Sequence, residues 1–472
     1  MRTIIGLEVH AQLLTQTKIF CGCSAEYFGA APNAHTCPVC LGMPGALPVL
    51  NEKAVEFALK AALALNCEIP LRSKFDRKNY FYPDLPKGYQ ISQYDEPIAI
   101  NGFLNLILDD GQTKKIRIRR LHLEEDAGKS IHMPDGKSLV DLNRAGVPLI
   151  EIVTEPDLAS AEEARLYMEE LRRILRYIGV CSGDLEEGSL RCDANVSVSA
   201  DGTLGTKTEI KNMNSFRAVE EAIKFEVLRQ TEILKSGGTI VQATLTWNAE
   251  QNKTEIMRTK EEAQDYRYFP DPDLVPLEIN ETWKKKISDA LPELPQAKRA
   301  RWKEEFGLPD YDIDILSDEL PIALYFESAV KTYAKPKEIS NWMLSELLRL
   351  LKESQSKELN ISPEHFVAVL KMVESGQINR STGKEVLEEA FNTGKAPEAI
   401  VSEKGLGQIS DEGALIEAIA QVIGENPKAV ADFKSGKEAV VGFLQGQVMK
   451  KTQGKADPKK TRELLIEQLK KA

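Results

Sequence analysis

Gly6-Leu7-Glu8-Val9-His10-Ala11-Gln12-Leu13 alternates apolar and polar residues with a period of two. Side chains of a β-strand alternate between its two faces, so this stretch predicts a strand with one apolar and one polar face. The polar face carries a carboxylate, an imidazole and an amide, at Glu8, His10 and Gln12. The stretch therefore predicts a half-buried sheet that presents metal-binding groups on one side.

Four further segments combine apolar and charged residues in the same way. They centre on 122–124, on Glu151 within 148–153, on Arg191, Asp193 and Asn195, and on Lys207, Glu209 and Lys211. If the five strands share one sheet, their acids converge on a common surface, and cations must neutralise them. We therefore predict a divalent-metal site that handles phosphate. The alternative is a solvated sheet face, the usual fate of alternating polar positions.

The composition is that of a soluble globular protein, with 42% hydrophobic and 28% charged residues in a chain of 472. This length predicts two or three domains. No apolar run approaches the roughly 18 residues that span a bilayer, and the N-terminus has no signal-peptide pattern. We therefore expect a cytoplasmic protein with no membrane contact.

The net charge of −11 argues against broad nucleic-acid binding but permits one local basic patch.

Three helices are predicted among the N-terminal strands. One begins near Asn51, one follows Ser160 with a capping-box spacing to Glu163, and one covers 216–235. The strands between them are separated by Gly, Pro and Asp turn signals.

The character of the chain changes after the proline-rich stretch 291–295, where strand signals end and short helices follow. A second break falls at 394–407, where Gly and Ser cluster. We therefore predict an α+β protein with a mixed domain over 1–292, an all-α helical domain over 293–402 and a small helical tail over 403–472.

Four of the seven cysteines lie close together. Cys21-Gly-Cys23 is followed, after thirteen intervening residues, by Cys37-Pro-Val-Cys40. Two thiolate pairs on a short loop suit tetrahedral zinc and leave no position open for catalysis. The other interpretation is four free thiols. We predict a structural zinc knuckle over 21–40.

Basic residues occur in the same segments as the acids: Arg117, Arg119, Arg144, Arg191, Lys207 and Lys211. Carboxylates for Mg²⁺ and cations for phosphates are what nucleotide-dependent phosphoryl transfer requires. The sequence has no Gly-x-x-x-x-Gly-Lys-Ser/Thr loop, no Gly-x-Ser-x-Gly elbow and no Ser–Lys amidase arrangement. The chain therefore lacks a nucleophile of its own for releasing ammonia from an amide.

Two aromatic segments and a lysine-rich tail each allow two interpretations. The aromatic residues of 80–90 and 266–273 either stack on nucleic-acid bases or fill a core beneath a loop. The tail lysines form either a solvated helix face or a contact with RNA phosphates. These lysines are Lys434, Lys437, Lys450, Lys451, Lys455, Lys459 and Lys460.

Several long motifs, taken together, point to one family. They cover 5–13, 37–51, 78–90, 122–129, 141–157, 188–197, 209–216 and 265–274, with 426–430 and 446–458 in the tail. In combination they resemble the GatB/GatE family, the B subunits of the aspartyl/glutamyl-tRNA amidotransferases. The resemblance spans essentially the whole chain, and so many long motifs make it highly specific.

The resemblance implies an N-terminal cradle domain with an antiparallel sheet, related to glutamine synthetase and guanidino kinases, followed by a helical domain and a YqeY-type tail. It implies ATP- and Mg²⁺-dependent phosphorylation of the side-chain carboxylate of mischarged Glu-tRNA(Gln), and often Asp-tRNA(Asn), before ammonia displaces the phosphate. It also implies two partners: an amidase A subunit that hydrolyses glutamine and a small C subunit that braces the pair. The missing nucleophile agrees with this division.

By motif position, we expect catalysis and Mg²⁺ binding at Glu8, His10, Glu124, Glu125 and Glu151. We expect the nucleotide site to include Arg191, Asp193, Lys207, Glu209 and Lys211. We expect zinc at Cys21, Cys23, Cys37 and Cys40, and tRNA contacts at Lys434, Lys437, Lys450, Lys451 and Lys455.

Two hypotheses of other classes stay open from the sequence. The chain is either a zinc-bearing tRNA adaptor whose partner performs the chemistry, or a free-standing ATP-dependent amide ligase for a small amino acid. Loss of activity on substitution of the carboxylates would argue against the adaptor. A requirement for aminoacylated tRNA would argue against the amide ligase.

Overall fold

The structure is a computed structural model that describes residues 1–200, 202–259, 265–354, 358–407, 412–437, 439–452 and 456–471. The chain divides into two compact units, Met1–Lys298 and Arg299–Ala472. The first contains a large sheet with helices, and the described elements of the second are helices, which confirms the α+β class. The predicted boundary at residue 292 lies close to this division, whereas the tail boundary at residue 403 stays a prediction.

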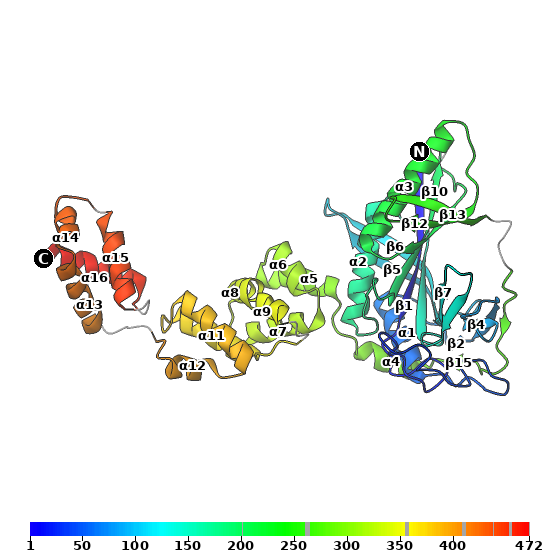
Figure 1. Cartoon of the computed structure of the whole chain (residues 1–472), viewed down its shortest axis with the longest axis horizontal. Coiled ribbons are helices and arrows are strands. Elements are labelled where there is room, and N and C mark those ends of the chain that lie inside the picture. Colours follow the sequence, from blue (N-terminus) through cyan, green and yellow to red (C-terminus); the bar gives the residue numbers. More distant parts are fainter. Residues whose placement is uncertain are drawn as a thin grey trace. The chain divides into compact units, whose positions relative to one another are not determined.

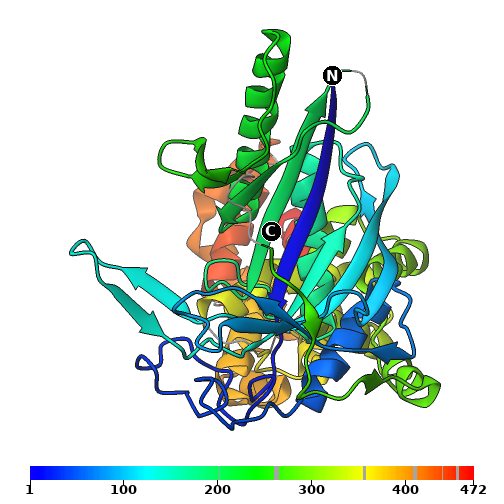
Figure 2. The same cartoon turned by 90° about the vertical axis from the view of Figure 1, so that its right-hand side faces the viewer.

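The first unit is built on an eight-stranded sheet with β1 near its centre (Figure 1, Figure 2). The strand order is β13-β12-β11-β10-β1-β9-β6-β5. The bounds are β1 (Arg2–Gln12), β5 (Ala99–Ile107), β6 (Thr113–Glu125), β9 (Pro148–Thr154), β10 (Leu190–Ser199), β11 (Thr208–Met213), β12 (Ala243–Asn248) and β13 (Lys253–Thr259). All five alternating segments belong to this sheet, which confirms that they share it.

One pair of neighbouring strands departs from the expected antiparallel sheet. Strands β11 and β12 run parallel, whereas the other neighbouring pairs are antiparallel. The reason is the connection between them, because α3 (Phe216–Lys235) carries the chain back before β12 begins. A parallel pair needs such a crossover, and an antiparallel pair does not. The expectation is therefore corrected to a mixed sheet.

Three helices pack into the core beneath the sheet: α1 (Glu52–Ala64), α2 (Ala161–Tyr177) and α3. Figure 1 shows α2 and α3 on one side of the sheet, with β4 and β7 on the other. Each helix begins at a capping side chain, because Asn51, Ser160 and Ser215 accept hydrogen bonds from backbone N–H groups of the first turn. The three predicted helices are confirmed.

The apolar face of β1 anchors the sheet in this core. Leu7, Val9 and Ala11 are at most 1% exposed and belong to the same cluster as the buried residues of the three helices. Burying one Val or Leu side chain contributes about 1.5–3 kcal/mol. A slip of one residue would move all of them into water, so the register holds Glu8 and His10 on the opposite face.

Three small sheets complete the first unit. Their strands are β3 (Asp76–Asn79) with β4 (Tyr89–Ser92) and β14 (Phe269–Pro270), β2 (Arg72–Ser73) with β15 (Leu277–Glu278), and β7 (Lys129–His132) with β8 (Ser138–Asp141). Strand β4 packs against β6, and α4 (Glu281–Asp289) packs against α1. The sheet β14-β3-β4 therefore brings together the two aromatic segments that are far apart in the sequence.

The helices that follow begin with α5 (Pro295–Phe306), α6 (Asp310–Leu316), α7 (Leu320–Thr332), α8 (Pro336–Trp342), a π-helical turn (Met343–Leu347), α9 (Leu348–Glu353), α10 (Pro363–Glu374), α11 (Arg380–Thr393) and α12 (Pro397–Glu403). Trp302, Phe326, Trp342 and Phe366 are fully buried among them. The last four helices, α13 (Glu412–Glu425), α14 (Pro427–Lys434), α15 (Val440–Lys451) and α16 (Pro458–Lys471), share a separate small core. Within the described residues, no helix has the length and apolar character needed to cross a bilayer.

Candidate active site

Strand register places four polar side chains together on one face of the sheet. His10 of β1 lies opposite Glu151 of β9, and Glu151 lies opposite His122 of β6. Residues that face each other on antiparallel strands project to the same side. Glu124 is two positions from His122 on β6, so it projects to that side as well. Three strands therefore bring two carboxylates and two imidazoles into one group.

The geometry of His10, Glu124 and Glu151 fits a single divalent cation. The Nε2 atom of His10 lies 3.4 Å from Glu151 Oε2 and 3.8 Å from Glu124 Oε1. One ligand atom from each of the three residues lies within 4.8 Å of the others. Ser92 donates a hydrogen bond of 2.9 Å to Glu124 Oε2 and so orients that carboxylate. Carboxylate oxygens are the ligands that Mg²⁺ prefers.

Both carboxylates are held in the anionic form that a metal ligand needs. Burial alone would raise their pKa values, but the imidazole of His122 lowers the pKa of Glu124, and His122 and His10 hold the pKa of Glu151 well below its usual range. For His10, burial disfavours the charged ring, yet the neighbouring carboxylates outweigh it and raise the pKa.

His122 is a member of the site that the sequence interpretation did not select. Its Nε2 atom lies 3.2 Å from Glu151 Oε2 and 3.4 Å from Glu124 Oε2, and its Nδ1 is buried without a hydrogen-bond partner. Burial opposes protonation, but both carboxylates outweigh it and raise the pKa to about 9. The sequence did contain a signal for it, because His122 and Glu124 are two positions apart in the alternating segment 122–124 and so project to the same face of a strand.

The polar face lines a cavity of about 590 Å³. Its lining includes His10, Lys78, Tyr80, Glu124, Arg191 and Lys211. This volume lies within the range of small-molecule sites, which is about 300–1,000 Å³. Five of the predicted site residues, His10, Glu124, Arg191, Asp193 and Lys211, therefore line a space that accommodates a substrate group.

Glu8 and Lys207 both form hydrogen bonds with the side-chain amide of Asn195. The carboxylate oxygen Oε1 of Glu8 accepts a hydrogen bond of 2.9 Å from Asn195, and Lys207 donates one of 2.8 Å to the amide oxygen of Asn195. Burial raises the pKa of Glu8, and nearby carboxylates raise it further. The structure thus places Glu8 beside the predicted nucleotide residues, outside the group of three that meet the metal-site geometry.

The other predicted nucleotide-binding cations are paired with acids. Lys211 forms an ion pair with Asp193, and its Nζ lies 3.1 Å from Glu209 Oε1. Arg191 lies 2.7 Å from the buried carboxylate of Asp126. These partners fix the two cavity-lining cations in place.

Glu125 faces away from the other predicted metal ligands. Its carboxylate pairs with Lys87 and accepts a hydrogen bond of 2.8 Å from the backbone N–H of Ile91. Successive residues of a strand project to opposite faces, so Glu124 and Glu125 cannot share one. The structure therefore connects Glu125 to the loop before β4.

The two aromatic segments pack against each other, and Tyr80 of the first segment lines the cavity. The N–H of Asn79 donates a hydrogen bond of 2.9 Å to the carbonyl of Tyr266. The ring centroids of Tyr80 and Tyr266 are 5.9 Å apart, and Tyr94 and Tyr268 stack at 4.2 Å. These tyrosines pack on one another, and Tyr80 reaches the cavity lining. Base stacking by these segments stays a prediction.

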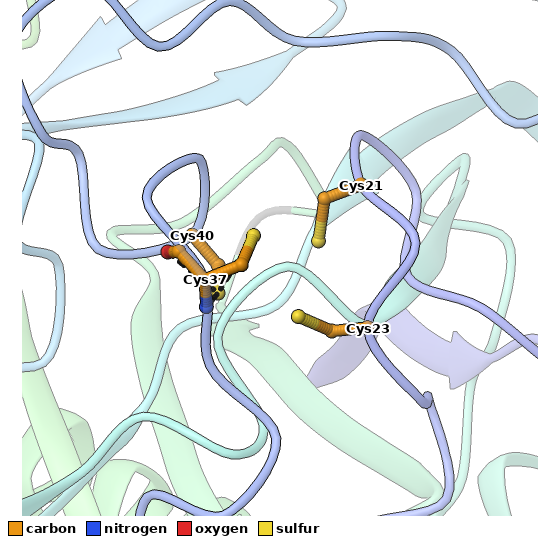
Figure 3. A group of neighbouring side chains, drawn as sticks. All are labelled: Cys21, Cys23, Cys37 and Cys40. Carbon is orange, nitrogen blue, oxygen red and sulfur yellow. Dashed lines mark hydrogen bonds between the residues drawn. The ribbon is translucent and has the colours of Figure 1, made fainter.

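The four clustered cysteines converge in space, as Figure 3 shows. Their sulfur atoms all lie within 4.8 Å of one another, and those of Cys37 and Cys40 are 3.9 Å apart. A tetrahedron with metal–sulfur distances of about 2.3 Å needs sulfurs about 3.8 Å apart. A hydrogen bond with Cys21 lowers the pKa of the Cys40 thiol to about 4 and raises that of Cys21. The cluster therefore fits a zinc ion.

The predicted tRNA-binding lysines of the tail are exposed where the structure describes them. Lys437 lies 3.0 Å from Asp432, and Lys451 lies 2.5 Å from Glu425. Lys434 and Lys450 form no ion pair within the described part of the tail. Lys455 lies outside the described residues.

The chain belongs to the GatB/GatE family. Residues 3–285 match the GatB/GatE catalytic domain, and residues 324–469 match the GatB domain of the YqeY type. The B subunit of an aspartyl/glutamyl-tRNA(Asn/Gln) amidotransferase from Thermodesulfovibrio yellowstonii is 57% identical, with 99% of each chain covered. Proteins with the same name from Persephonella marina and Brevibacillus brevis are 54% and 53% identical, with 98–99% of each chain covered.

We predict that Asp126→Asn destabilises the first unit by roughly 2–4 kcal/mol, because it leaves the Arg191 guanidinium without its charged partner. Asp157→Asn, which breaks an ion pair between Asp157 and the exposed Arg117, is the matched control and should destabilise the unit much less, because water screens an exposed ion pair. Urea unfolding, followed by hydrogen exchange of the β9 and β10 amides, measures both. Equal effects of the two variants would contradict the prediction.

Proposed function

We propose that the chain is the B subunit of an enzyme that converts mischarged Glu-tRNA(Gln), Asp-tRNA(Asn) or both to the amide form. ATP phosphorylates the side-chain carboxylate of the aminoacyl group, and ammonia then displaces the phosphate. The relatives of known name are B subunits of aspartyl/glutamyl-tRNA(Asn/Gln) amidotransferases. The observation that carries the proposal is the group of His10, Glu124 and Glu151, two of which, His10 and Glu124, line the cavity.

The first unit acts in this proposal as a cradle related to glutamine synthetase and guanidino kinases. Its residues hold the acceptor carboxylate in a space walled by the small sheet β14-β3-β4, which limits access of water to a reactive acyl phosphate. Glu124, Glu151 and His10 would hold Mg²⁺. Bound Mg²⁺ screens the charge on the phosphoryl oxygens and on the acceptor carboxylate during transfer.

The remaining residues of the site position and neutralise the nucleotide. Lys211 and Arg191 are fixed by Asp193 and Asp126, so they present their remaining donors to phosphate oxygens without reorganisation. Lys207, Glu209 and Glu8 extend the same face of the sheet toward the remainder of the nucleotide.

Ammonia comes from a partner in this proposal. The sequence has no amidase nucleophile, and the naming of the relatives as B subunits agrees with an enzyme of several different chains. We propose an amidase A subunit that hydrolyses glutamine and a small C subunit that braces the pair. We propose that the assembly works in the cytoplasm, because its proposed role is in translation.

We further propose that the cysteine cluster binds structural zinc and that the exposed lysines of the tail contact tRNA phosphates. The sulfur geometry supports the first. The cluster of lysines on an acidic chain supports the second.

Glu151→Gln is expected to lower the rate of amide formation at least about 100-fold, because it removes a negative ligand of the metal while keeping the shape of the side chain. The assay uses the assembled enzyme with glutamine, ATP and each mischarged tRNA. Glutamine hydrolysis by the partner should persist, and Glu162→Gln on the exposed face of α2 should behave like the wild type. Near-normal amide formation by Glu151→Gln would favour the adaptor hypothesis.

Cys40→Ala is expected to remove bound zinc, since a three-thiolate site loses the tetrahedral closure of the wild type. Metal content, measured by plasma mass spectrometry on the purified chain, should fall from about one zinc per chain to a small fraction, and the melting temperature should fall with it. Cys67→Ala, at a cysteine outside the cluster, is the control and should keep its zinc. Wild-type protein without metal would refute the zinc assignment.

The double variant Lys434→Glu/Lys450→Glu is expected to weaken tRNA binding by about tenfold and to reduce its salt dependence, because it removes two phosphate contacts. Filter binding across a salt series measures both quantities. Lys235→Glu/Lys286→Glu, at two exposed lysines of the first unit, is the charge-matched control. An unchanged salt slope would show that these lysines are solvated and do not contact RNA.

A further inference from the structure

Lys78 differs from the other cations that line the cavity. Among the described residues, the lysine and arginine side chains that line it are Lys78, Arg191 and Lys211. Arg191 is paired with Asp126, and Lys211 with Asp193 and Glu209. Lys78 forms no ion pair or hydrogen bond with any side chain in the described part of the chain. It is therefore a cation whose partner is not supplied by the described protein.

Strand alternation directs Lys78 into the cavity. Its neighbour Arg77 projects to the other side of β3, where its Nε lies 2.9 Å from Asp271 and its Nη2 lies 2.7 Å from Asp273. Lys78 projects to the cavity side, as its place in the lining shows. The local sequence thus separates a structural cation from one that is presented to a ligand.

Tyrosine rings hold the Lys78 ammonium in place. Its Nζ lies 5.0 Å from the ring centroid of Tyr266 and 5.9 Å from that of Tyr80. The two rings are themselves in edge-to-face contact, with centroids 5.9 Å apart, so both lie beside the ammonium. Cation–π contacts of this kind stabilise a charge without neutralising it. The ammonium therefore keeps its full charge and its donors for an anion.

The carboxylates of the site face this ammonium without reaching it. Burial disfavours the charged form of Lys78, but the fields of Glu124, Glu151 and the tyrosines outweigh burial and raise its pKa. A divalent cation on Glu124 and Glu151 would cancel their two charges. With that cation bound, the charge of Lys78 would make the site positive overall. Such a site suits an anionic group that lies between the metal-bound carboxylates and the ammonium.

We propose that Lys78 is a catalytic residue whose ammonium binds the oxygens of the phosphoryl group as that group passes from ATP to the substrate carboxylate. This inference rests on the proposed function. A lysine is a compact point charge, which suits three equivalent phosphoryl oxygens whose charge shifts during transfer.

The reaction balances with Lys78 keeping its protons. In the first step, a carboxylate oxygen of the substrate forms a bond to the γ-phosphorus of ATP, and the bond from that phosphorus to the ADP oxygen breaks. In the second step, ammonia forms the C–N bond, the bond from the acyl carbon to the phosphate oxygen breaks, and one ammonia proton passes to the released phosphate. Lys78 binds the phosphoryl oxygens in both steps and is not consumed.

The test compares Lys78→Met, Lys78→Arg and Lys115→Met in the assembled enzyme. Methionine keeps an unbranched apolar stem and removes the charge, and arginine restores a charge with different geometry. Lys115 is the matched control, because its ammonium also lies over an aromatic ring, 3.8 Å from the centroid of Phe103, but is exposed. The readouts are aminoacyl-tRNA-dependent ATP turnover and calorimetric binding of ADP, of ADP with trifluoroberyllate as a phosphoryl mimic, and of aminoacyl-tRNA.

Lys78→Met should lower turnover by about 100-fold and weaken binding of ADP with trifluoroberyllate by about tenfold, while binding of ADP alone and of aminoacyl-tRNA stays within about twofold. Lys78→Arg should recover part of both losses, and Lys115→Met should match the wild type. Wild-type turnover in Lys78→Met would overturn the inference, as would a loss of trifluoroberyllate binding no larger than the loss of ADP binding. Absence of turnover in the wild type would instead refute the proposed function.

Discussion

The first unit depends on the enclosure of two carboxylates beside each other on a sheet. Glu124 and Glu151 are 2% and 7% exposed. A buried carboxylate without a partner costs several kcal/mol, and two adjacent ones repel each other as well. His10 and His122 reduce this cost in the protein alone, and a divalent cation would reduce it further. Burial of the apolar faces of the same strands fixes their register and so keeps the two carboxylates together despite this cost.

The small sheet β14-β3-β4 converts a polar sheet face into a cavity. It joins 76–79 to 269–270, which lie far apart in the chain, and packs through β4 against β6. Its strands apply the same alternation as β1: Arg77 binds Asp271 and Asp273 on one side, and Lys78 lines the cavity on the other. Strand alternation therefore directs side chains into the cavity both from the eight-stranded sheet and from β3 of the small sheet.

The ion pairs of the site distinguish two kinds of cavity-lining cation: Arg191 and Lys211 are held by acids, whereas Lys78 has no acidic partner among the described residues. Asp126 holds Arg191 with the help of a hydrogen bond of 2.7 Å from Gln12, so the end of β1 is tied to the start of the turn after β6. Glu125 is held in the same way by Lys87. These contacts stabilise the scaffold, and they leave Lys78 as the lining cation that retains its charge without an acidic partner among the described residues.

Periodicity in the sequence was sufficient for the elements and for much of the site. The alternation of 6–13 determines the faces of β1, the cap residues Asn51 and Ser160 determine where α1 and α2 begin, and the spacing of Cys21, Cys23, Cys37 and Cys40 brings four thiols together. These are local properties, because a strand, a helix start and a short cysteine loop depend on neighbouring residues alone.

Only the tertiary structure decided which charged groups meet. Placing His122 beside Glu151 requires the register between β6 and β9, and turning Glu125 toward Lys87 requires the loop before β4 to pack on β6. The parallel pair β11 and β12 follows from the path of α3, and the pairing of Arg191 with Asp126 joins residues 65 positions apart. Contacts of this kind depend on strand order and packing, and a sequence pattern read along the chain does not contain them.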